Sequence, residues 1–118
     1  MSEPRVTSAL WVAAYLRRIQ GQGGFAVVAQ RGAEAAGAIY IHISRFDGHE
    51  RLIGPAPQVL YESAESGDRR FAEIVPETVE IERISDKLAR ESRFDPDLWI
   101  IAVEDRDGRD FLDAALVS

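Results

Sequence analysis

The most constraining feature of this sequence is an alternating stretch at residues 38–45 that ends in a tight turn. Isoleucine occupies every second position of its centre (Ile39, Ile41, Ile43), with Tyr40 and His42 between them. Alternation with a period of two predicts a β-strand with one apolar and one polar face. Asp47 and Gly48 follow, and this pair is typical of the turn in a β-hairpin. We therefore expect at least one antiparallel pair of strands.

Helices and further strands are predicted around this hairpin. In chain order the expected elements are a helix at 8–20, strands at 25–30, 38–45 and 51–53, a helix at 78–92 and a strand at 98–103. Residues 71–75 fit either a strand or the lead-in to the second helix. Strands joined by tight turns pair antiparallel, so we expect an α+β fold in the order α-β-β-β-α-β. Its antiparallel or mixed sheet would have four to five strands, with both helices packed on one face.

Length and composition limit the class of protein. The 118 residues suffice for a single domain spanning residues 1–118. The absence of cysteine excludes a disulfide scaffold and a thiolate metal site. The apolar stretch at 9–16 is too short to cross a membrane, and Arg17 and Arg18 follow it instead of preceding it as in a signal peptide. We therefore expect a cytoplasmic protein without membrane contact.

Charge argues against nucleic acid as a partner. The formal net charge is -6, and residues 71–118 hold 13 of the 20 acidic side chains. Binding to phosphates depends on clustered cations, which this balance does not provide. Nothing in the sequence predicts a cofactor.

Carboxylates concentrated near the end of the chain are the candidate metal ligands. Asp97, Glu104, Asp105 and Asp107, together with Asp95, could bind a hard divalent cation in a metal-dependent enzyme such as a phosphoesterase or a nuclease-like protein. The simpler interpretation of the acidic run at 104–113 is a solvent-exposed hairpin tip with an Asp-Gly turn. For Asp95 and Asp97 it is a structural role, in which they cap turns or pair with Arg109.

A nuclease fold is one way to read the predicted order of elements. Nucleases related to restriction endonucleases share that order and carry an acidic pair and a lysine on their second and third strands. Here residues 38–45 contain no carboxylate, and no acid-x-Lys triplet lies near Glu50. The sequence therefore gives this alternative little support.

Aromatic, histidine and arginine side chains favour a non-enzymatic binding or protein-interaction module. Trp, Tyr and Arg dominate the energetics of protein interfaces, and the polar strand face with Tyr40 and His42 could meet a protein partner or a second copy in a twofold dimer. The candidate binding residues are Tyr40, His42, Arg45, Tyr61, Asp95, Asp97 and Trp99. For Trp99 the alternative is a place in the core, and for His42 the wet face of a strand.

Several segments together resemble a known family. They are residues 11–18 (WVAAYLRR), 54–58 (GPAPQ), 69–71 (RRF) and 94–100 (FDPDLWI), followed by Glu104-Asp105 and Gly108-Arg109. The chain resembles DUF1491, a family of small proteins of unknown function found mainly in alphaproteobacteria. The resemblance implies a bacterial cytoplasmic setting and assigns no activity or catalytic residue.

Overall fold

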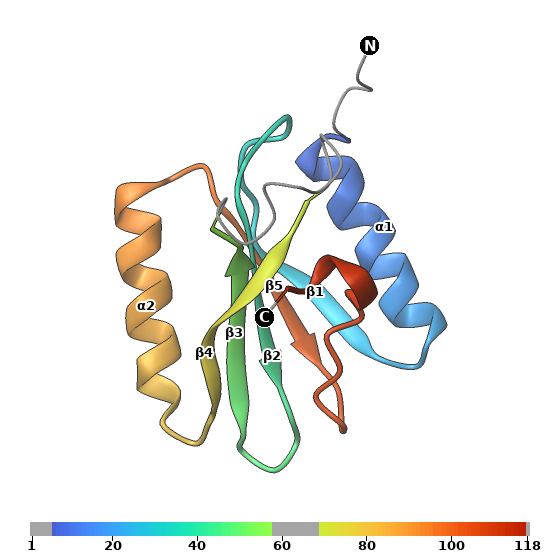
Figure 1. Cartoon of the computed structure of the whole chain (residues 1–118), viewed down its shortest axis with the longest axis vertical. Helices are drawn as coiled ribbons and strands as arrows, with labels where there is room; N and C mark the ends of the chain where they lie inside the picture. Colours follow the sequence, from blue (N-terminus) through green and yellow to red (C-terminus); the bar gives the residue numbers. More distant parts are fainter. Residues whose placement is uncertain (1–5, 58–68, 118) are drawn as a thin grey trace.

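The computed structural model describes residues 6–57 and 69–117, which form a five-stranded mixed sheet and two helices (Figure 1). In chain order the elements are α1 (Ser8–Gly21), β1 (Phe25–Gln30), β2 (Ile39–Ser44), β3 (Glu50–Pro55), β4 (Phe71–Thr78), α2 (Ile81–Phe94), β5 (Trp99–Glu104) and the short 3₁₀ helix η2 (Asp113–Ala115). The strands lie side by side in the order β1-β5-β2-β3-β4. Only the pair β2 and β5 is parallel; the other neighbours are antiparallel.

The predicted α+β class and the mixed sheet are confirmed. The hairpin that the isoleucine alternation predicted is the pair β2 and β3, in which Ile41 lies opposite Ile53. Its turn uses Gly48 at a φ of 89°, a region that favours glycine, and the backbone N–H of His49 donates to Asp47 Oδ1. Local turn chemistry and side-chain period therefore fix this part of the fold.

The second helix begins later than predicted, because a fourth strand comes before it. The ambiguous residues 71–75 are the start of β4, which continues through Pro76 to Thr78 and pairs with β3. A proline cannot donate to a neighbouring strand, but β4 lies at the edge of the sheet, where that loss is tolerated. The order of elements is therefore α-β-β-β-β-α-β.

The prediction that both helices pack on one face is wrong, because they lie on opposite faces. Leu52 and Ile53 are neighbours in β3, so their side chains point to opposite sides, and both are fully buried. Ile53 belongs to the core cluster under α1, whereas Leu52 packs with Ile84 and Leu88 of α2. Each helix needs an apolar surface to cover, and β3 offers one on each side.

The larger core lies between α1 and the sheet. Val12, Tyr15 and Ile19 of α1 are buried against alternate residues of β2 and β5, among them Ile41 and Ile101. The helix begins at an N-cap, Thr7, whose Oγ1 accepts a hydrogen bond from the backbone N–H of Leu10. The predicted helix is thus confirmed.

Within residues 6–57 and 69–117, no helix combines the length and the apolar character needed to span a membrane.

Candidate functional sites

The predicted polar face of β2 is partly covered by α2. Tyr40 Oη donates a 3.2 Å hydrogen bond to Glu91 Oε2 on α2, and the Tyr40 ring lies against Gly54. Burial, together with the charges of Glu91 and Asp95, raises the pKa of Tyr40 to about 12. His42 Nε2 lies 2.6 Å from Glu50 Oε1, and both side chains are largely buried. Tyr40 therefore helps to hold α2 against the sheet, and His42 helps to hold β2 against β3. Neither side chain is mainly available to a partner.

The remaining predicted binding residues are not gathered at one site. Arg45 follows the end of β2 and pairs with Glu77 and Asp47. Trp99 opens β5 in the core, where it is 1% exposed and donates from Nε1 to the carbonyl oxygen of Ala33. It is therefore a core residue and offers no surface to a partner. Tyr61 lies outside the described residues.

The predicted metal ligands are also separated. Asp97 precedes β5 and Glu104 ends it, so the length of a six-residue strand, roughly 20 Å, lies between them. Asp105 is buried, and its carboxylate accepts hydrogen bonds from Arg109, from Nε at 3.1 Å and from Nη2 at 2.8 Å. Asp107 follows in the exposed turn.

No group of three or more His, Cys, Asp or Glu side chains that could hold a metal ion occurs among residues 6–57 and 69–117. Asp105 instead joins the end of β5 to the next turn.

One edge of the sheet is apolar and exposed. In the part of the chain that the structure describes, β1 pairs only with β5, and its sequence FAVVAQ holds neither charge nor proline. Phe25, Val27 and Val28 are 53%, 44% and 36% exposed. Natural edge strands are normally protected by charges, prolines or covering segments. We call these six residues the open edge.

The opposite edge has the protection that the open edge lacks. β4 carries Glu73, Pro76 and Glu77, and the C-terminal segment covers its first residue. Leu116 forms a parallel bridge with Phe71, and the N–H of Val117 donates to the carbonyl oxygen of Phe71. The two edges of this sheet therefore differ in their capacity to add a strand.

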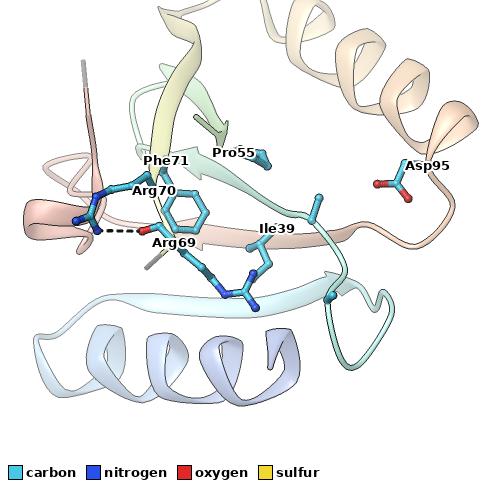
Figure 2. A pocket seen from close by; sticks show the side chains of 8 residues that line it. Ile39, Pro55, Arg69, Arg70, Phe71 and Asp95 are labelled. Carbon is cyan, nitrogen blue, oxygen red and sulfur yellow. Dashed lines mark hydrogen bonds between the residues drawn. The ribbon is translucent and has the colours of Figure 1, made fainter. Parts of the chain in front are cut away.

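A pocket of about 300 Å³ lies at the end of the sheet where β2 and β4 begin and β3 ends (Figure 2). We call it the end pocket; its lining residues are Ala36, Ala38, Ile39, Pro55, Arg69, Arg70, Phe71 and Asp95. Figure 2 shows the side chain of Arg69 extending toward Ile39, whereas that of Arg70 points away and donates to the Arg69 carbonyl oxygen. Asp95 lies on the far side of the pocket.

Opposite charges lie on the two sides of the end pocket. Arg69 Nη2 donates a 2.7 Å hydrogen bond to the carbonyl oxygen of Val6, which fixes where the guanidinium lies. On the other side, Asp95 lines the pocket. Of the residues around the pocket, the sequence singled out only Asp95 for binding.

Sequence reasoning missed the other functional candidates for a physical reason. Arg69 and Phe71 come together with Asp95 only because β4 and the end of α2 meet at one end of the sheet. The open edge could have been noticed, because residues 25–30 form an uncharged strand without proline. That strand is an edge only because β5 occupies its other side.

Comparison with known proteins identifies the family. The family model of DUF1491, described as a protein of unknown function, matches residues 6–113. A solution structure of an A. tumefaciens protein is 44% identical, with a TM-score of 0.73 and 86% of each chain covered. A crystal structure of a DUF1491 family protein from Caulobacter crescentus is 32% identical, with a TM-score of 0.77 and coverage of 96% of this chain and 98% of that chain.

An NMR structure of a DUF1491 family protein from Caulobacter crescentus gives the same TM-score of 0.77 at 34% identity, with 98% of this chain and 100% of that chain covered. A search of curated proteins finds no match. The predicted resemblance is therefore confirmed, and the chain belongs to the DUF1491 family.

Proposed function

We propose that this chain is a non-enzymatic protein-interaction module whose first partner is a second copy of itself, joined edge to edge through β1. The observation that carries the proposal is the open edge, an exposed strand without charge or proline at a sheet border. Such a strand has unpaired backbone donors and acceptors that another strand can satisfy. The expected product is one continuous sheet of ten strands, twice the five of one chain.

Self-complementarity favours a second copy over an unrelated strand. Two antiparallel copies of one strand are related by a twofold axis, which is the symmetry of most homodimers. An axis near Val27 places the two Val27 side chains opposite each other, and Phe25 lies on the same face of the sheet. Because the strand itself is uncharged, the net charge of -6 on each chain is not concentrated at the contact.

The proposed contact is small, and this sets the expected affinity. A six-residue strand with three partly exposed apolar side chains buries less surface than a standard interface of about 1,600 Å². We therefore expect a dissociation constant in the micromolar range.

The absence of cysteine supports a cytoplasmic setting, because the fold gains nothing from an oxidising compartment.

Sedimentation velocity of the full chain from about 2 to about 200 µM tests the proposal. The wild type should shift from monomer to dimer, and Val27→Lys should stay monomeric, because a lysine on an edge strand opposes further pairing. Val79→Lys is the matched control: Val79 is 62% exposed between β4 and α2, so this variant should dimerise like the wild type.

Circular dichroism confirms that each variant is folded. A wild type that stays monomeric over the whole range contradicts the proposal, and so does a folded Val27→Lys variant that dimerises as strongly as the wild type.

A further inference from the structure

A pocket of about 400 Å³ lies between β4 and α2, at the edge of the sheet opposite β1. Figure 1 shows α2 at this border of the sheet. The strand contributes two apolar side chains to the lining, Ile74 and Val75, and the helix contributes charged ones. The charged lining residues are Arg83, Asp86, Lys87 and Arg90. We call this the edge pocket; it combines an apolar surface with three cations and one anion.

The three cations lie along one side of α2. Residues three, four or seven apart share a side of a helix, and Arg83 and Arg90 are two turns apart, about 11 Å along the axis. At that separation, two extended arginine side chains can meet over Lys87 between them. Asp86 follows the buried Ile84 by two residues, a rotation of about 200°, so it points away from the sheet at the outer rim. The cations therefore lie nearer to β4 than the single anion does.

The guanidinium groups of Arg83 and Arg90 are open to a ligand. Both residues are exposed, and within residues 6–57 and 69–117 neither guanidinium forms a hydrogen bond or an ion pair. Lys87 differs, because its Nζ lies 3.0 Å from Glu91 Oε1, so we assign it no direct bond to the ligand. Like charges three or four residues apart destabilise a helix. An anion bound between these side chains would remove that repulsion.

We propose that the edge pocket binds a small phosphate monoester with an apolar body. A phosphate group carries up to two negative charges and three acceptor oxygens, so it can accept hydrogen bonds from both guanidinium groups at once. A carboxylate has one charge and two oxygens, which a single guanidinium satisfies in a two-bond arrangement. The apolar body would pack against Ile74 and Val75. The volume of about 400 Å³ lies within the range of small-molecule sites.

This site goes beyond the proposed dimer and does not depend on it. None of its lining residues belongs to β1, and β1 and β4 are the two opposite edges of the sheet. Pairing through the open edge therefore leaves the edge pocket of each chain unchanged.

Titration of the isotope-labelled full chain by NMR tests the proposal. The probes are phenyl phosphate, inorganic phosphate and benzoate, each up to about 20 mM at constant ionic strength. Phenyl phosphate should give saturable shifts at the amides of Ile74, Val75 and Lys87. Inorganic phosphate lacks the apolar body and benzoate lacks the second charge, so each should bind at least roughly threefold more weakly than phenyl phosphate.

Variants locate the site. Arg83→Gln and Arg90→Gln should each weaken the binding of phenyl phosphate at least roughly threefold, because each removes one charge-assisted contact. Arg17→Gln is the matched control: it removes the same charge from an exposed position of α1, on the other face of the sheet, and should leave binding unchanged. Val27→Lys should also bind normally, so failure of the dimer proposal leaves this one standing.

The proposal is overturned if phenyl phosphate gives no saturable shifts, or if its shifts fall outside the pocket. It is also overturned if benzoate or inorganic phosphate binds as tightly as phenyl phosphate, or if folded Arg83→Gln and Arg90→Gln variants bind it like the wild type. The comparison of the three probes uses the wild-type chain, so it remains decisive if a variant fails to fold.

Discussion

The carboxylate of Asp105 is held by three hydrogen bonds from one residue, Arg109. The backbone N–H of Arg109 donates to Oδ2 at 2.9 Å, its Nε donates to the same oxygen at 3.1 Å, and its Nη2 donates to Oδ1 at 2.8 Å. The guanidinium also reaches the carbonyl oxygen of Gln22 at 3.2 Å. The pair therefore ties the end of β5 to the turn that ends α1.

Replacing Asp105 by Ala should lower the free energy of unfolding by about 2 kcal/mol, the scale of lost hydrogen bonds to a charged group. Urea denaturation measures this change. Asp107→Ala is the control, because Asp107 is exposed in the same turn and its removal should change stability by less than about 0.5 kcal/mol. Equal effects of the two variants would show that Asp105 has no special structural role.

The same pair should make stability depend on acid pH. Hydrogen bonds from Arg109 hold the pKa of Asp105 below its ordinary value. The unfolded chain therefore takes up this proton first, and the stabilisation is complete above the unfolded pKa of about 3.9 and is lost as the pH falls through the folded pKa. The difference in unfolding free energy between wild type and Asp105→Asn, followed from neutral pH downward, should thus shrink below about pH 4. A difference that stays constant contradicts this assignment.

Tyr40 should make the stability of the fold depend on pH under alkaline conditions. Its pKa is raised to about 12, first by burial and then by Glu91, so the fold favours the neutral phenol. The resulting stabilisation is complete below the unfolded pKa of about 10 and is lost as the pH rises through about 12. Phenolate absorbance should show that the Tyr40→Phe variant lacks a tyrosine titrating near pH 12. Loss of a tyrosine that titrates near pH 10 instead would contradict the burial of this phenol under α2.

Gly37 should be far less replaceable than Gly21. A Cβ atom at Gly37 would overlap the backbone carbonyl oxygen of Asp97, and backbone cannot move aside as a side-chain tip can. Gly37→Ala should therefore cost roughly 2–3 kcal/mol of unfolding free energy. At Gly21, the last residue of α1, a Cβ meets nothing within 4 Å, so Gly21→Ala should be neutral or stabilising by up to about 1 kcal/mol. Thermal and urea unfolding of both variants measure the contrast.

The parts of the fold that depend on residues close together in the chain could be predicted from the sequence. The isoleucine alternation of β2 and the Asp47-Gly48 turn each act within a few residues, and both are confirmed. The run at 71–75 was ambiguous because β4 is defined by its pairing with β3.

The candidate sites were less predictable. Trp99 and Arg45 have the side chains of interface residues, but whether such groups face solvent depends on what packs over them. Burial in the core removes Trp99 from any surface, and ion pairs with Asp47 and Glu77 engage Arg45. The residue type alone does not predict that Trp99 is buried or that Arg45 forms these ion pairs.

The sequence by itself determined both helices, every strand except β4, the family and the absence of cysteine chemistry, because these follow from residue type and short-range spacing. Tertiary structure alone decided that α1 and α2 cover opposite faces. Ile53 is buried under α1 and Leu52 under α2, and both burials require β3 to have a helix on each side of the sheet. Tertiary structure also decided that β1 is an edge and that Arg69 and Asp95 share a pocket. The physical reason is that edges and pockets are made by contacts between residues far apart in the chain.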